Sequence, residues 1–280
     1  MKKVGVVGAG TMGSGIIQTF AEKGFEVLAY ESYAPARSTA QSRIEKGIRK
    51  RVEKKQMEPD AAERSLAGIR WCDDISGLAE AEFAVEAIIE DYEAKVGVFR
   101  RLDEVTRPDV ILGSNTSSIS ITKIARNTRR AERCIGMHFM NPVPLMPLVE
   151  IIRGHVTSDD TYHTTAQLAR DLGKTPVEVN DYPGFVSNRV LMPMINEAIY
   201  ALWEGVGTRE SIDQVMKLGM NHPMGPLELA DFIGLDVCLA IMNVLHEGFS
   251  DSKYRPCPLL KKMVDAGHFG RKSGRGFYQY

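Results

Sequence analysis

Two side chains that can exchange or hold a proton, His138 and Glu150, lie on either side of a proline-rich stretch near the middle of the chain. His138 ends a predicted strand at residues 133–138. Glu150 lies in the next predicted strand, 148–152, among aliphatic residues where an unpaired charge would be costly. A lone histidine is more often a structural group. Here the buried carboxylate needs a partner, and a histidine paired with a carboxylate is typical of general acid–base catalysis. The pattern therefore predicts a functional His138–Glu150 pair.

Two other segments place small polar side chains beside predicted elements. Ser114-Asn115-Thr116-Ser117-Ser118 directly follows a predicted strand at 109–113. These residue types often cap helices, but five in succession exceed what one cap needs, which favours a functional loop. Asn188 lies about one turn into a predicted helix, where it either only starts the helix or faces a ligand.

A glycine-rich turn near the N-terminus predicts a dinucleotide site. Gly8-Ala9-Gly10-Thr11-Met12-Gly13 follows a predicted strand at 3–7 and opens a helix that runs to Gly24. In the GxGxxG pattern the first glycine allows a tight turn and the second lets the backbone approach the pyrophosphate. The third lets the helix pack closely on the strand. The helix N-terminus then presents N–H groups to the phosphates.

An acidic residue at the end of the second predicted strand, 25–30, bears on which dinucleotide binds. Glu31 can accept a hydrogen bond from a ribose hydroxyl and would repel a 2′-phosphate. We therefore expect NAD rather than NADP, with Gly8, Gly10, Thr11, Met12, Gly13 and Glu31 as cofactor-binding residues. Arg37 leaves NADP as an alternative, because it lies only a few residues beyond Glu31.

These residues need a sheet with helices to position them, and the first part of the chain alternates the two. Further strands are predicted at 82–86 and 176–179, and helices at 36–57, 92–105 and 161–172, the first of these with a basic face. Such alternation predicts a Rossmann-type, doubly wound, mostly parallel α/β sheet. Ligands in these folds bind at the carboxyl ends of the strands.

The pattern changes after a turn at Tyr182-Pro183-Gly184. Helical spacing follows at residues 185–204, 210–218, 226–247 and 258–266. We expect two domains: a nucleotide-binding domain at 1–183, and a smaller all-α domain at 184–280 that forms the substrate cleft and pairs the subunits.

Composition excludes several classes of function. The net charge is −1, so no general field attracts nucleic acid or membrane. No apolar run approaches the roughly 20 residues of a membrane span, and no signal-peptide pattern is present. The four cysteines lack metal-binding spacing and are typical of reduced thiols, so we expect a cytoplasmic protein without a metal site.

Six ordered blocks resemble the L-3-hydroxyacyl-CoA dehydrogenase family, and most of all its short, single-function bacterial members. The blocks are GAGTMGSGI at 8–16, SNTSSISI at 114–121, HFMNPVPLMPLVE at 138–150, DYPGFVSNR at 181–189, NHPMGPLELAD at 221–231 and SGRGFY at 273–278. Their order over the whole chain makes the resemblance far more specific than any single motif.

The resemblance implies roles for particular residues. His138 matches the catalytic base and Glu150 its partner, while Ser117 and Asn188 match residues that contact the reacting part of the substrate. Positions around the nicotinamide ribose and carboxamide are matched by Glu90, Lys95 and Asn115. Lys50 and Lys54, in the predicted basic helix, are candidates for binding coenzyme A, although that face could equally be only solvated.

The implied activity is NAD-dependent oxidation of a short L-3-hydroxyacyl-CoA, such as 3-hydroxybutyryl-CoA, and the reverse reaction. The implied partners are an acyl-CoA substrate and a second copy of the chain in a homodimer. Two alternatives stay open: a related dehydrogenase of a small hydroxy or sugar acid, and a non-catalytic NADH-binding protein.

Overall fold

An eight-stranded sheet organises the first two thirds of the chain in a computed structural model that describes residues 1–280. The strands run in the order β3-β2-β1-β4-β5-β6-β7-β8, and only β6 and β7 pair antiparallel. Their bounds are β1 Lys3–Val7, β2 Glu26–Tyr30, β3 Ile69–Cys72, β4 Phe83–Glu86, β5 Ile111–Ser114, β6 Cys134–Phe139, β7 Leu148–Arg153 and β8 Thr175–Asn180. The predicted doubly wound α/β sheet is confirmed.

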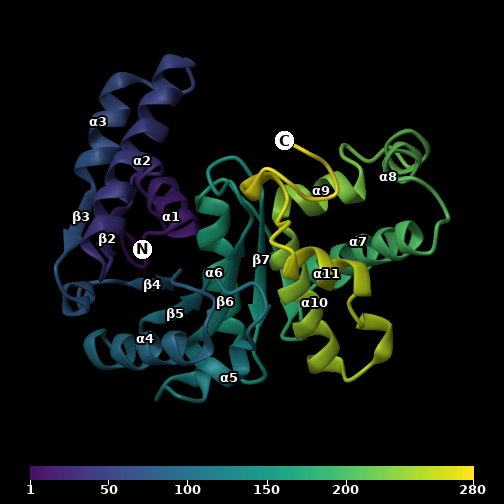
Figure 1. The fold of residues 1–280 in the computed structure, drawn as a ribbon. Coiled ribbons are helices and arrows are strands. Elements are labelled where there is room, and N and C mark those ends of the chain that lie inside the picture. The colour runs from purple at the N-terminus through teal and green to yellow at the C-terminus, as the bar shows by residue number, and fades with distance from the viewer. The chain divides into compact units, whose positions relative to one another are not determined.

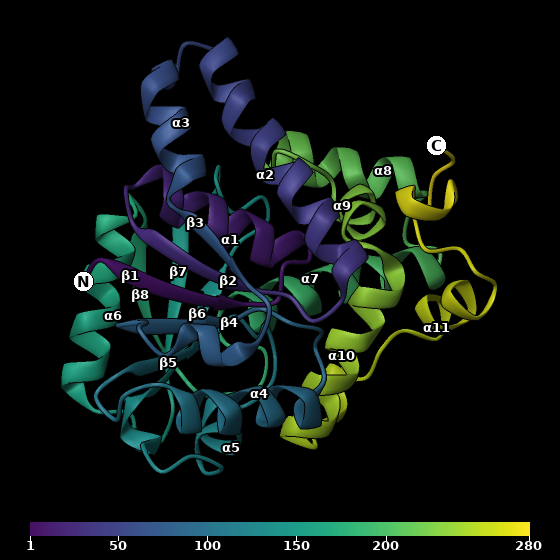
Figure 2. The same ribbon diagram turned by 90° about the vertical axis from the view of Figure 1, so that its left-hand side faces the viewer.

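Helices cover both faces of this sheet, because side chains alternate between the two faces along each strand. Phe83 and Val85 pack with α1 (Thr11–Glu22), α2 (Ala34–Glu53), α3 (Pro59–Ala67) and α6 (Asp159–Asp171). Ala84, between them, packs on the other face with α4 (Tyr92–Val105) and α5 (Ile121–Ala125). Figure 2 shows α1 and α2 above the sheet and α4 and α5 beneath it.

The predicted helix at 36–57 is wrong at its C-terminal end. Helix α2 ends at Glu53, Lys54 is its C-cap, and Lys55 has a positive φ of 57° that ends the helical path. Pro59 then starts α3, which the sequence analysis did not predict, and the two helices lie side by side in Figures 1 and 2. Lys54 therefore lies at the end of the basic helix and not within it.

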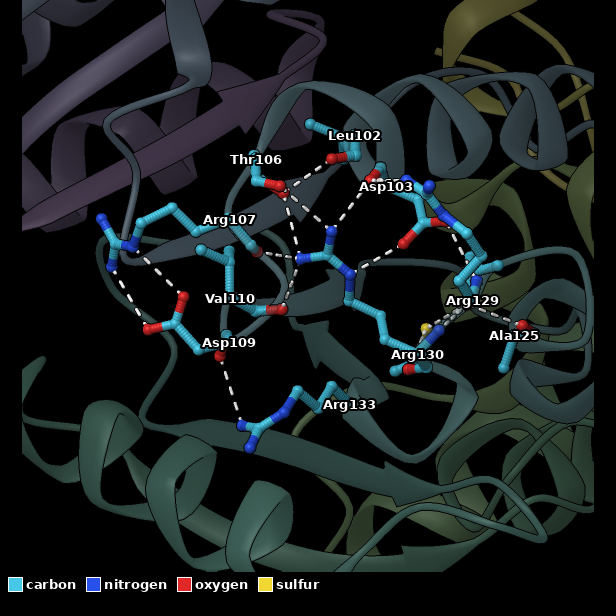
Figure 3. A network of polar contacts seen from close by, with 12 residues as sticks. Leu102, Asp103, Thr106, Arg107, Asp109, Val110, Ala125, Arg129, Arg130 and Arg133 are labelled. Carbon is cyan, nitrogen blue, oxygen red and sulfur yellow. Dashed lines mark hydrogen bonds and ion pairs between the residues drawn. The ribbon is translucent and has the colours of Figure 1, made fainter.

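A buried arginine fixes the C-terminal end of α4 (Figure 3). Arg130 Nε donates to Asp103 Oδ1 at 2.7 Å, and Nη2 donates to the backbone carbonyls of Asp103 and Thr106 at 2.8 and 3.1 Å. Nη1 also donates to the carbonyls of Arg107 and Val110. The last carbonyls of a helix have no partner within it, so Arg130 supplies donors that the helix lacks.

The chain divides into two compact units, Met1–Asp181 and Tyr182–Tyr280. The second contains α7 (Ser187–Trp203), α8 (Arg209–Gln214), α9 (Pro226–Ile233), α10 (Leu235–Phe249) and α11 (Pro258–Asp265), around a core of its own. The single helix predicted at 226–247 is wrong. Gly234, with φ 106°, separates α9 from α10, and their axes differ by 98°.

The apolar side chains of this unit divide between its own core and its surface. Leu227 and Leu235 are fully buried in the core, whereas Phe232 is exposed. No single helix of the chain is both long and apolar enough to cross a bilayer; α9 and α10 meet that length and composition test only as a bent pair.

Candidate active site and nucleotide cavity

The glycine turn between β1 and α1 has the geometry that its motif requires. Gly8 has φ +92°, and a Cβ there would lie 2.7 Å from the carbonyl oxygen of Ala87. A Cβ on Gly13 would overlap the carbonyl of Gly8, so helix and turn can approach only at a glycine. A Cβ on Gly10 would meet no protein atom within 4 Å, which leaves the backbone open to a ligand.

A cavity of about 890 Å³ opens beside this turn. It is lined by Gly8, Gly10, Thr11, Met12 and Glu31, all predicted cofactor-binding residues. Gly13, Glu90, Lys95 and Asn115 are not among its lining residues. The lining also includes residues that the sequence analysis did not name: Tyr33, Ile75, Ile88, Ile89, Val98 and Arg101. The signal for Ile88 and Ile89 was their position just past the carboxyl end of β4.

Backbone hydrogen bonds hold Glu31 at the rim of this cavity. Its Oε2 accepts from Ala9 N at 2.8 Å and its Oε1 from Tyr33 N at 3.0 Å. Arg37, which could have served a 2′-phosphate, is engaged elsewhere. Its Nη1 lies 2.7 Å from Asp73 Oδ1, and its guanidinium stacks on Trp71. This environment fits an unphosphorylated ribose better than a 2′-phosphate.

A buried ion pair lies behind the end of β4. Lys95, on the first turn of α4, is 1% exposed, and its Nζ lies 2.6 Å from Glu86 Oε1 and 3.4 Å from Glu90 Oε2. Glu86 also accepts from Ser114 Oγ at 2.7 Å. The sequence analysis missed Glu86, although a carboxylate at the end of an aliphatic strand was the signal that singled out Glu150.

Glu90 organises the loop after β5. Its Oε1 accepts from Thr116 Oγ1 at 2.6 Å, from Ser117 N at 2.9 Å and from Ser118 N at 3.1 Å. Burial alone would raise the pKa of Glu90, but the charge of Lys95 and these hydrogen bonds outweigh it, and the pKa lies below its usual range. Helix α5 is instead capped by Ser120, so the 114–118 run is not simply a helix cap.

His138 and Glu150 face each other across the antiparallel pair β6–β7. The Nδ1 of His138 lies 2.8 Å from Glu150 Oε2, and both side chains are buried. Because β7 runs opposite to β6, its first residues lie at the edge where β6 ends. Asn115 Oδ1 accepts from Phe139 N at 3.0 Å, which ties the 114–118 loop to the end of β6.

A second cavity, of about 310 Å³, lies between α2 and the loop at 141–145. Its lining includes four cations, Arg43, Lys50, Arg51 and Lys54, so the structure brings the two lysines proposed for coenzyme A to one groove. We call it the basic groove. Asn188 belongs to the second unit, where it is buried in the first turn of α7 and its N–H donates to Gly184 O.

Fold and site together define an α/β nucleotide-binding protein that carries a buried histidine–carboxylate pair. Comparison with known families specifies the class. The family description "3-hydroxyacyl-CoA dehydrogenase, NAD binding domain" matches residues 3–182, and "3-hydroxyacyl-CoA dehydrogenase, C-terminal domain" matches residues 184–280. The chain belongs to the 3-hydroxyacyl-CoA dehydrogenase family, as the six sequence blocks predicted, and NAD is confirmed as its cofactor.

Named relatives support the same family, and the expectation of an NAD-dependent oxidoreductase is confirmed. A protein of Deinococcus radiodurans named "Probable 3-hydroxybutyryl-CoA dehydrogenase" is 54% identical over 99% of this chain and all of that protein. The human "Hydroxyacyl-coenzyme A dehydrogenase, mitochondrial" is 39% identical over the whole of this chain and 91% of that protein. The crystal structure of (S)-3-hydroxybutyryl-CoA dehydrogenase from Ralstonia eutropha superposes with a TM-score of 0.98 at 47% identity, covering 100% of this chain and 99% of that one.

Proposed function

We propose that this chain interconverts a short L-3-hydroxyacyl-CoA, such as 3-hydroxybutyryl-CoA, and the corresponding 3-ketoacyl-CoA, using NAD. The observation that carries the proposal is the 2.8 Å contact between His138 and Glu150. It lies at the carboxyl edge of the sheet, the edge at which the nucleotide cavity opens. Names of relatives that share this chain's full length support the substrate class.

In this proposal His138 is the acid–base group. It takes the proton of the 3-hydroxyl group during oxidation and returns it to the ketone oxygen during reduction. Glu150 holds the imidazole through Nδ1, which assigns Nε2 to the substrate, and stabilises the imidazolium once it forms. NAD, when bound, would supply the hydride chemistry at C3 of the substrate, while the protein positions C3 and moves the proton.

Ser117 and Asn188 are proposed to hydrogen-bond the substrate oxygens, and Glu90, Lys95 and Asn115 to serve the nicotinamide end of the cofactor. The support for Ser117 is that its N–H and its Oγ both donate to Glu90 Oε1, at 2.9 and 3.2 Å, which holds the hydroxyl beside Glu90. Lys95 is too buried to reach far into solvent, so we propose that it supports this part of the site by holding Glu90.

We propose that the basic groove binds the phosphates of coenzyme A. Phosphates bind best where several cations lie close together, and Arg43, Lys50 and Lys54 all line this groove. Replacing both lysines by alanine should raise the KM for acetoacetyl-CoA but not for a pantetheine thioester that lacks the nucleotide. The effect should shrink at high salt, because exposed charges are screened within about 10 Å at 0.1 M.

The matched control for the groove is Lys46→Ala, an exposed lysine on the same helix that does not line the groove. It should leave both KM values unchanged. Equal KM values for the double variant and the parent on acetoacetyl-CoA would remove Lys50 and Lys54 from the site and favour a merely solvated face.

We propose separate roles for the two domains predicted from the sequence. Domain 1–183 binds NAD, and domain 184–280 contributes Asn188 and pairs with a second copy of the chain. Exposed apolar side chains in the second unit, such as Val206 and Leu218, support the homodimer. Sedimentation equilibrium measures the oligomeric state and so tests the homodimer.

We place the protein in the cytoplasm because its four cysteines are buried free thiols.

Reduction of acetoacetyl-CoA, followed by the loss of NADH absorbance, tests the proposed function directly. We expect turnover with NADH well above that with NADPH. Turnover of small free keto acids without turnover of the thioester would favour the related dehydrogenase of a hydroxy or sugar acid. Tight NADH binding without turnover of either substrate would favour the non-catalytic reading.

A further inference from the structure

A buried lysine outside both cavities holds the loop that joins the two halves of the acid–base pair. Lys174 lies just before β8 and is 8% exposed. Its Nζ donates to the carbonyl oxygen of Val143 at 2.6 Å and to that of Met146 at 2.8 Å. Both acceptors belong to residues 140–147, the segment between β6 and β7, which we call the β6–β7 loop.

The loop has few polar contacts of its own. Within it, the N–H groups of Leu145 and Met146 both donate to Pro142 O. Val143 packs against α1 at Gly15, where a Cβ would lie 2.9 Å from Val143 Cβ. At its end, Pro147 O accepts from Thr175 N at 2.7 Å. Lys174 adds two charge-assisted hydrogen bonds, which are stronger than neutral ones and hold the middle of the loop.

Other charges face Lys174 from α1 and α2. Burial lowers the pKa of Lys174, Glu22 opposes that effect, and Lys23 and Arg51 add to it. Glu22 is itself paired with Arg51, which lines the basic groove. Two of the groups that interact with Lys174, the Arg51 side chain and the β6–β7 loop, therefore also line the basic groove.

The position of the β6–β7 loop affects both the His138–Glu150 pair and the basic groove. Only the Phe139–Val149 pair separates the His138–Glu150 pair from the loop. On its outer side the loop contributes Pro142, Val143 and Leu145 to the basic groove. A shift of the loop would therefore reach both the histidine–carboxylate contact and the groove wall.

We propose that Lys174 is a positioning residue that sets the β6–β7 loop, and through it both the His138–Glu150 geometry and the wall of the basic groove. The proposal rests on the proposed function of that pair. Lys174 touches neither cavity; it acts through the Val143 and Met146 carbonyls.

The test compares Lys174→Met, which keeps length but loses the charge and the donors, with Lys174→Arg, which keeps both. With acetoacetyl-CoA and NADH, Lys174→Met should lose roughly 10- to 100-fold in kcat, as expected when catalytic groups are misplaced by about 1 Å. KM for acetoacetyl-CoA should rise, and the Kd for NADH should stay within about twofold. The midpoint of the kcat–pH profile should move to lower pH, because a loosened Glu150 stabilises the imidazolium less.

Lys174→Arg should recover most of kcat and restore the midpoint. Lys23→Met is the matched control and should behave as the parent. Lys23 is the exposed C-cap residue of α1, and its Nζ lies beside Gly173, the residue before Lys174. If Lys174→Met does not fold, Lys174→Gln is measured in its place, because glutamine keeps a neutral donor group. We then expect the same changes in kcat, KM and pH midpoint, but smaller ones.

Parent values of kcat, KM and pH midpoint in a folded Lys174→Met or Lys174→Gln protein would overturn the proposal. So would a fall in kcat with an unchanged pH midpoint and KM. If the parent itself does not reduce acetoacetyl-CoA, the proposed function fails. The NMR titration of the His138 ring in parent and variant then decides the role of Lys174 alone: a shifted midpoint supports it, and identical curves refute it.

Discussion

Replacing Arg130 by methionine should destabilise the first unit more than almost any other single change at a charged residue. Arg130 is 5% exposed, and methionine keeps most of its apolar volume but none of its donors. The change leaves Asp103 buried with only Arg129 as a charged partner, and it leaves the carbonyls of Thr106 and Val110 without the guanidinium. Breaking a buried pair of this kind costs about 3–5 kcal/mol.

Urea unfolding measures this free energy. Trp71 lies in the first unit and Trp203 in the second, so a Trp203→Phe background makes tryptophan fluorescence report on the first unit alone. With a urea dependence of about 3 kcal/mol per M, the expected loss lowers the midpoint by about 1–2 M. The matched control is Arg107→Met, which breaks an exposed pair with Asp109 and should cost less than about 1 kcal/mol.

Acid should reduce the difference between parent and Arg130→Met. Burial raises the pKa of Asp103, but hydrogen bonds from the Arg129 backbone and from the Arg129 and Arg130 side chains bring it below its usual range. A lowered folded-state pKa gives stability that is complete above the unfolded-state value of about 3.9 and is lost as pH falls through the folded value. A loss below about 1 kcal/mol at pH 7, or an equal loss in Arg107→Met, would refute the role assigned to Arg130.

Three further predictions concern the site. His138→Ala should lower kcat by roughly 10²–10⁴-fold with NADH binding unchanged in a fluorescence titration, and a loss under tenfold would show that His138 is not the base. Glu150→Gln should also lower kcat and move the pH midpoint of kcat downward, whereas an unchanged profile would show that the two residues are not coupled. Glu31→Ala with Ser32→Arg should raise the ratio of kcat/KM for NADPH over NADH, because repulsion of the 2′-phosphate is removed and a partner added. A parent that already prefers NADPH would contradict the role of Glu31.

The elements that sequence predicted well are those whose structure is decided locally. The turn from β1 into α1 follows from where Gly8 and Gly13 stand, and α4 follows from an Asp91 cap and an apolar face. Strand β3 was missed because its four residues lie at the sheet edge, half exposed, and its only strand partner is β2, about 40 residues earlier. The break at Gly234 was missed because apolar spacing continues on both sides of it.

The site, like the fold, contains residues that the sequence could identify and residues that depend on distant partners. His138 and Glu150 could be paired from sequence because a carboxylate among aliphatic residues needs a partner, and a histidine lies at the end of the preceding predicted strand. Lys174 could not be found in this way. Its partners, Val143 and Met146, are about 30 residues earlier and are backbone carbonyls, which carry no signal in the sequence.

The buried charges beside the 114–118 loop act through position more than through net stabilisation. An ion pair such as Lys95–Glu86 recovers its desolvation cost only when the geometry is good and the remaining hydrogen bonds are satisfied. Here Glu86 is satisfied by Ser114, and Glu90 is satisfied by the loop that carries Ser117. Apolar side chains could fill the same volume, but they could not fix a loop of small polar residues in one conformation. The buried lysines and carboxylates are therefore best understood as supports that hold proposed catalytic side chains in place.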